Sequence, residues 1–196
     1  MNHRHVLAAV AATLALGAAL TGSRTTDVAT LARQIQHEDD HVTALELAQW
    51  IKDRKPGLRV LDIRSDSEFN EFHIPSAERL PLEELTKLRP KGNETLVLYS
   101  EGGAHAAQGW VLLRSVGFDK VYFLKGGLLD WMDDVMSPMI PEAGISPASD
   151  SMRVRVGALS RYFGGLPRVG IVPLSGTHAQ PASLSASIAR TRRRGC

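Results

Sequence analysis

The chain has 196 residues, enough for one domain with extensions. Its hydrophobic content of 43% and charged content of 22% are ordinary for a globular protein. The single cysteine is Cys196, so the sequence excludes an intrachain disulfide framework and a structural zinc site built from cysteines.

Charge is distributed unevenly along the chain. Residues 42–142 contain 12 Lys or Arg and 16 Asp or Glu, whereas residues 143–196 contain eight Arg and one Asp. This pattern predicts a mildly acidic domain followed by a basic tail. Residues 175–196 are rich in Ser, Ala and Thr and end in "RTRRRGC", so we expect a disordered tail. The alternative is that its arginines contact anionic lipid or an acidic partner.

The N-terminus has the pattern of an export signal. A short basic region, "MNHRH", precedes an uninterrupted apolar run from Val6 to Leu20. A run of this length suits a signal peptide better than a spanning helix, which needs about 20 residues. Residues 1–25 are therefore interpreted as a signal peptide or a retained signal anchor, and we expect export to the bacterial periplasm. A buried Ala-rich helix is the alternative.

Residues 26–41 are expected to form a short helix and a linker. Apolar side chains recur at three- and four-residue spacing between Asp27 and Gln36, which is typical of an amphipathic helix. His37 and His41 are four residues apart and could bind a metal on a helix, but no third ligand is evident. The sequence therefore predicts no metal site and no cofactor.

From residue 42 onward, predicted helices alternate with predicted strands. Thr43 and Glu46 form a capping box that marks the first helix start. The alternation predicts an α/β fold over residues 42–136, with a central parallel β-sheet flanked by helices on both faces. Residues 137–174 are expected to be a Pro- and Gly-rich loop that can hold one helix. Within the domain we predict buried strands over 58–64, 95–99 and 120–124, short helices within 67–81 and over 82–88, and helices over 106–116 and 127–135.

Three sequence blocks, in the same order and with suitable spacing, resemble the rhodanese-like domain family. They are "LDIRSDSEFNEFHIPSAERLP", "LVLYSEGGAHAAQGWVLLRSVGF" and "VYFLKGGLLDWMDDV". The resemblance covers about half of the chain. It implies a structural role, holding loops by hydrogen bonds and ion pairing or packing in the core, for the motif residues Asp62, Arg64, Glu68, His73, Pro75, Gly126, Gly127 and Trp131.

The departures from the family pattern fall in its active loop, C-x-x-G-x-R-[ST]. Aligned without gaps, Ser100 stands where the resemblance implies the catalytic cysteine, Gly103 keeps the loop glycine, and His105 replaces the arginine. The family's cysteine acts as a thiolate that carries a persulfide, and loop N–H groups stabilise that thiolate. A serine cannot form a persulfide. Glu101 adds a negative charge, and a histidine is mostly neutral above about pH 6.5.

The loop formed by Ser100, Glu101, Gly102, Gly103, Ala104 and His105 is therefore expected to be vestigial. Its N–H groups predict weak binding of a small anion at Ser100, Gly102, Gly103 and His105. The favoured function is an exported rhodanese-like module that lacks sulfurtransferase activity, is not an enzyme, and binds a protein partner or a small anion. No nucleic-acid ligand is expected.

Three alternatives stay open. Cys196 could supply the missing thiol, with its pKa lowered by neighbouring arginines, which would make the protein a sulfurtransferase. Ser100 could act as a nucleophile with His105 or His73 as base, although no oxyanion hole is specified. The chain could also be a membrane-associated subunit of a larger assembly, held through its N-terminal apolar segment or its Arg-rich tail.

Overall fold

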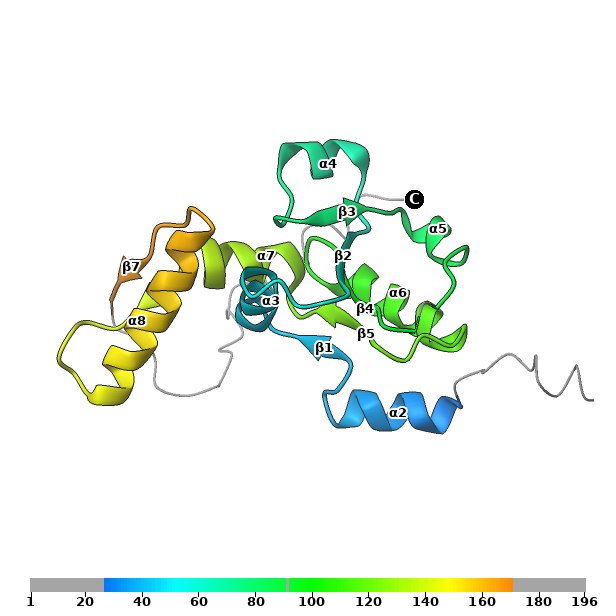
Figure 1. Cartoon of the computed structure of the whole chain (residues 1–196), viewed down its shortest axis with the longest axis horizontal. Coiled ribbons are helices and arrows are strands. Elements are labelled where there is room, and N and C mark those ends of the chain that lie inside the picture. The colour runs from blue at the N-terminus through cyan, green and yellow to red at the C-terminus, as the bar shows by residue number, and fades with distance from the viewer. Residues whose placement is uncertain (1–26, 91, 171–196) are drawn as a thin grey trace, which may run out of the picture.

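The computed structural model describes residues 27–90 and 92–170 (Figure 1). The predicted signal segment, the predicted basic tail and Cys196 lie outside these described residues. Within the described ranges, no helix is long and apolar enough to cross a membrane.

A five-stranded, all-parallel sheet forms the centre of the domain, in the order β1-β5-β4-β2-β3. The three predicted strands are confirmed as β2, β4 and β5, with β2 ending two residues earlier than expected. β4 is central and every one of its residues is buried, as continuous apolar strands in covered parallel sheets are. The sequence missed the two short edge strands. The strands are β1 (His41–Val42), β2 (Leu58–Asp62), β3 (Ala77–Arg79), β4 (Thr95–Tyr99) and β5 (Val121–Leu124).

Helices cover both faces of the sheet, which confirms the predicted α/β architecture. One face packs against α3 (Ala44–Lys52), α7 (Gly127–Trp131), the π-helical turn η1 (Met132–Met136) and α8 (Pro147–Tyr162). The other face packs against α5 (Leu82–Leu85), α6 (Ala104–Ser115) and a side chain of α2 (Val28–Gln36). The predicted capping box of Thr43 and Glu46 is present at the start of α3. A second capping box, formed by Ser65 and Glu68, begins α4 (Asp66–Glu71).

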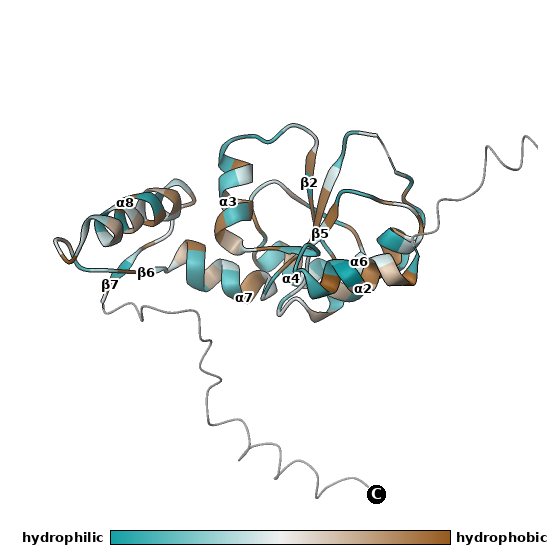
Figure 2. Ribbon diagram, turned by 90° about the horizontal axis from the view of Figure 1, so that it is seen from below, coloured by the Kyte–Doolittle hydropathy of each residue, from teal (hydrophilic) through white to brown (hydrophobic). Residues whose placement is uncertain are grey.

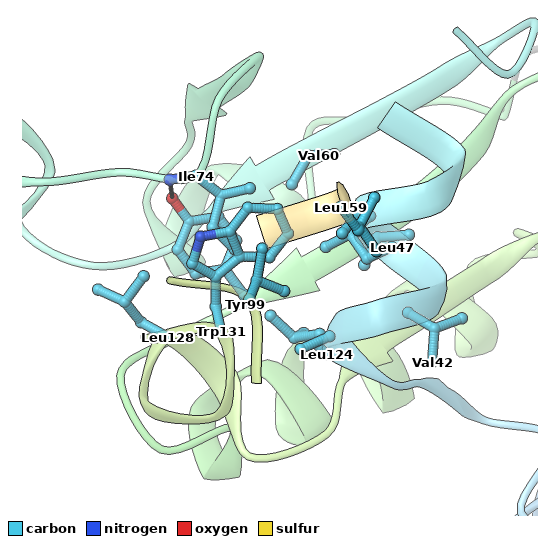
Figure 3. Packing of buried hydrophobic residues seen from close by; sticks show 13 residues of the cluster. Val42, Leu47, Val60, Ile74, Tyr99, Leu124, Leu128, Trp131 and Leu159 are labelled. Carbon is cyan, nitrogen blue, oxygen red and sulfur yellow. Dashed lines mark hydrogen bonds between the residues drawn. The ribbon is translucent and has the colours of Figure 1, made fainter. Parts of the chain in front are cut away.

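Each face of the sheet has its own hydrophobic core. Figure 3 shows the first core, where Tyr99 of β4 and Trp131 of α7 pack among Val60, Leu124 and Leu159. The second core gathers residues of β2, β4, α5 and α6: Leu61, Leu85, Leu96, Leu98, Trp110 and Leu113. Trp110 is buried and its indole N–H donates to the carbonyl of Val121 at 2.9 Å, so its role is packing.

The segment after η1 is more ordered than a loop. The short strands β6 (Met139–Ile140) and β7 (Arg168–Val169) pair in parallel, and the 16-residue helix α8 lies between them in sequence. Figure 2 shows these elements together at one end of the molecule. Ser146 caps α8 by accepting from the N–H of Ser149, and Pro147 occupies the first turn, where its missing N–H costs nothing.

Candidate functional site

The candidate site lies where β4 ends and α6 begins. Tyr99 is the last residue of β4, and the loop passes through Gly103, whose φ of 86° is in the left-handed region. The helix begins at Ala104, two residues before the predicted start. Ala104 and His105 therefore belong to the first turn of α6, and the loop proper is Ser100–Gly103.

The start of α7 holds this loop in place. The backbone N–H of Leu128 donates to the carbonyl of Ser100 at 2.9 Å, and that of Leu129 donates to the carbonyl of Glu101 at 3.0 Å. A Cβ on Gly127 would lie 2.3 Å from the Ser100 oxygen and 2.6 Å from the Gly103 nitrogen. Only glycine fits there, because any Cβ would clash with the loop backbone, and the φ of 62° in the left-handed region adds a further cost.

Ser100 lines a cavity of about 430 Å³. The residue is 4% exposed, and within the described part of the chain its hydroxyl has no hydrogen-bond partner. The structure therefore shows no hydrogen bond between Ser100 and a histidine base, although His105 lines the same cavity. The other lining residues are Ile63, Arg64, Ser65, Glu68, Glu101, Gly102 and Ala104.

A second cavity of about 530 Å³ shares Arg64, Glu68 and Glu101 with the first, so the two adjoin. Its remaining walls come from α4, α7 and η1 and are mostly apolar. This second cavity was not predicted from the sequence, because no local pattern indicates that α4 and η1 lie beside the loop Ser100–Gly103. The additional lining residues are Glu71, Phe72, Leu128, Leu129 and Met132.

Arg64 lines both cavities, but its guanidinium is already engaged. It donates from Nη2 to Asp62 Oδ2 at 2.6 Å and from Nε to Asp62 Oδ1 at 3.0 Å, and Nη2 also donates to the Phe72 carbonyl at 2.7 Å. Burial lowers the pKa of Arg64, but the hydrogen bond and charge of Asp62 outweigh it, so the pKa is raised. The guanidinium therefore stays charged and bound to Asp62.

Tyr99 completes this buried network. Its hydroxyl accepts from the backbone N–H of Ile74 at 3.1 Å, the contact drawn in Figure 3. Burial, and then the hydrogen bond to Asp62, raise the pKa of the Tyr99 hydroxyl. Asp62 and Arg64 thus tie the end of β2 to β4 and to the chain that leads into β3.

Three further motif residues, His73, Trp131 and Pro75, lie outside the lining of the two cavities. The ring of His73 stacks on that of Phe69 at 4.1 Å, and its Nδ1 lies 2.9 Å from the Phe69 carbonyl. Trp131 is buried in the first core, and Pro75 is an exposed loop residue before β3.

His37 and His41 do not share a helix. His37 ends α2 and His41 begins β1, where its Nδ1 lies 2.8 Å from Asp40 Oδ1. Among the described residues, no three His, Cys, Asp or Glu side chains are grouped to hold a metal ion.

The ionised carboxylate of Glu68 is expected to stabilise the fold at pH values above its pKa. Hydrogen bonds from the Ser65 hydroxyl and then from the Ser65 backbone N–H lower the pKa of Glu68 below its usual 4.5. Because the folded pKa is the lower one, this contribution is present above pH 4.5 and is lost as the pH falls through the lowered pKa. Glu68→Gln keeps a capping side chain that does not titrate. Between about pH 5 and pH 3, the Tm of the wild type should fall more steeply than that of the variant; parallel curves would contradict this role.

The comparisons with known proteins agree with this architecture. The sheet and the strand–loop–helix site define the rhodanese-like class of α/β folds. Residues 43–134 match the family model of the rhodanese-like domain, and the fold over these residues is rhodanese-like.

Curated relatives share only this domain with the chain. A probable adenylyltransferase/sulfurtransferase, MoeZ of Mycobacterium tuberculosis, is 30% identical over 105 residues, covering 50% of this chain and 26% of the relative. A tRNA uridine(34) hydroxylase of Anaplasma phagocytophilum is 32% identical over 90 residues, covering 41% of this chain and 32% of the relative. The chain thus spans about a quarter to a third of the length of these relatives.

Two solved structures are examples of similar chains. The Alr3790 protein from Anabaena sp. is 32% identical, with 46% of this chain and 74% of that chain covered and a TM-score of 0.43. The human single-domain sulfurtransferase TSTD1 is 24% identical, with 47% and 94% covered and a TM-score of 0.43.

Proposed function

We propose that this rhodanese-like domain does not carry sulfur and acts as a binding or regulatory module. One observation carries the proposal: the buried residue at the start of the loop, directly after β4, is Ser100. Sulfur transfer from thiosulfate to cyanide requires a thiolate that takes the outer sulfur, releases sulfite and then gives the sulfur to cyanide as thiocyanate. A serine hydroxyl cannot form the sulfur–sulfur bond on which that sequence depends.

The electrostatics of the cavities also support the proposal. Glu68, Glu71 and Glu101 line them, and the guanidinium of Arg64 is held by Asp62. An anionic sulfur donor would meet more negative than positive charge there. The predicted anion binding at Ser100, Gly102, Gly103 and His105 rests on N–H groups at the start of α6, and these carboxylates oppose it.

Export to the periplasm and attachment to a membrane are further proposals. They rest on the apolar run from Val6 to Leu20 and on the arginines near Cys196. Both segments lie outside the described residues.

Steady-state assays of thiosulfate:cyanide transfer test the proposed function. We expect no turnover above the protein-free rate for the wild type and for Cys196→Ser. Ser100→Cys is expected to gain at most a small activity, because Glu101 and the other carboxylates still disfavour thiolate formation and donor binding. Turnover in the wild type that is lost in Cys196→Ser would contradict the proposal and assign sulfur transfer to Cys196. Turnover that survives Cys196→Ser would also contradict it.

A further inference from the structure

We propose that the two adjoining cavities beside Ser100 bind an organic cation, an ammonium or guanidinium group on an alkyl stem. This inference rests on the proposed function, because it names the ligand class of the same site. It differs from the anion predicted from the loop sequence, and four features of the described residues support it.

The first feature is the charge of the lining. Glu68, Glu71 and Glu101 come from α4 and the loop and contribute three carboxylates. The pKa of Glu68 is lowered, so its carboxylate is ionised at neutral pH. No hydrogen bond or ion pair within the described residues neutralises the side chains of Glu71 and Glu101. The N-terminus of α6 offers only about half a positive charge in return. The field inside the cavities therefore favours a cation.

The second feature is the unavailability of Arg64. An arginine holds an anion through N–H donors that no other acceptor already occupies. Arg64 already donates to both oxygens of Asp62 and to the Phe72 carbonyl. Its side chain is 8% exposed, and that of Asp62 is fully buried. Releasing this guanidinium to hold an anion would leave Asp62 buried without its counter-charge, which is costly.

The third feature is Ser100 itself. Although the residue is only 4% exposed, its hydroxyl oxygen remains accessible to solvent and can therefore reach a ligand in the cavity. Ser100 lines the cavity and lacks a hydrogen-bond partner for this hydroxyl among the described residues. A hydroxyl oxygen can accept a hydrogen bond from an N–H of an ammonium or guanidinium group. The ligand would thus satisfy a group that the folded domain leaves open.

The fourth feature is the apolar wall of the second cavity. Phe72, Leu128, Leu129 and Met132 line it next to Glu101, and Leu129 and Met132 are exposed to solvent. An alkyl stem can lie along such a surface while its charged end reaches the carboxylates. Lysine and arginine side chains have this form, and so do free alkylamines.

Titration of the full chain, followed by amide NMR shifts, tests the proposal with four probes. n-Pentylammonium and n-pentylguanidinium should shift the amides of residues 100–105 and of Leu129 and Met132, and added salt should weaken binding. Pentanoate, with the same stem and opposite charge, should not bind, and neither should thiosulfate. Comparing an alanine-based peptide with one central Lys to the same peptide with Gln tells whether the cation is a protein side chain or a free amine.

Variants link binding to the carboxylates. Glu71→Gln with Glu101→Gln should weaken binding of n-pentylammonium by about fivefold, which lies within the range that two exposed charges give. Glu83→Gln removes an exposed carboxylate of α5 that does not line either cavity, so it should leave binding unchanged.

Binding of pentanoate or thiosulfate at least as tight as that of the amines would overturn the inference. So would an absence of shifts with every cation, or amine binding that is unchanged in the double variant. These results leave the proposed lack of sulfur transfer intact, because that claim fails only if sulfur transfer is detected. Turnover together with cation binding would overturn the proposed function alone.

Discussion

Gly127→Ala is expected to destabilise the domain by about 3 kcal/mol or more. A methyl group there would lie 2.3 Å from the Ser100 carbonyl oxygen and 2.5 Å from that of Glu101. Both atoms belong to the backbone of the loop, so relief requires moving the loop rather than turning a side chain. The φ of 62° adds a further cost for any residue with a Cβ. Unfolding in urea, monitored by tryptophan fluorescence, measures the loss.

Gly144→Ala is the matched control for this change. Gly144 also has a left-handed φ, of 79°, but a Cβ there would meet no atom within 4 Å. We therefore expect only the conformational cost, about 1 kcal/mol. If Gly127→Ala cost no more stability than Gly144→Ala, this would contradict the close approach of Gly127 to the loop backbone.

Asp62→Asn is expected to cost about 3 to 5 kcal/mol, the range measured when one partner of a buried ion pair is removed. The amide keeps the size of the side chain but removes the charge that holds Arg64, whose side chain is only 8% exposed. It also replaces the carboxylate that, after burial, contributes to the raised pKa of the Tyr99 hydroxyl. Urea unfolding at neutral pH measures the free-energy difference from the wild type.

Lys87→Gln provides the comparison for a surface pair. Lys87 Nζ lies 3.8 Å from Glu84 Oε1, and both side chains are well exposed. Its removal should change the free energy of unfolding by less than about 1 kcal/mol. A loss for Asp62→Asn no larger than that for Lys87→Gln would contradict the account of the buried network.

Much of the fold could be predicted from the sequence because its strong signals are local. The runs at 58–64, 95–99 and 120–124, which are rich in Leu, β-branched or aromatic residues, appear as β2, β4 and β5, and Thr43 caps α3 as expected. The edge strands β1 and β3 have only two and three residues, which is too short for a period to be recognised. Their pairing is decided by neighbouring strands rather than by their own residues.

The loop could be located from its sequence, but the residues that lie opposite it could not. The loop sequence identified Ser100, Glu101 and His105, and the cavity contains all three. Glu71 and Met132 lie far from the loop in sequence and reach it only through the arrangement of α4 and η1. The excess of negative charge in the cavities depends on this long-range placement and on the ion pair between Arg64 and Asp62. The spacing of residues in the sequence does not reveal either one.

The central claim is that this rhodanese-like domain does not carry sulfur. Its most direct test is the intact mass of the full-length protein after incubation with thiosulfate, without cyanide or reductant. We predict a single unmodified species, also in Cys196→Ser, because Ser100 cannot form a persulfide. A species heavier by one sulfur atom in the wild type, located by fragmentation to any residue of the chain, would contradict the claim.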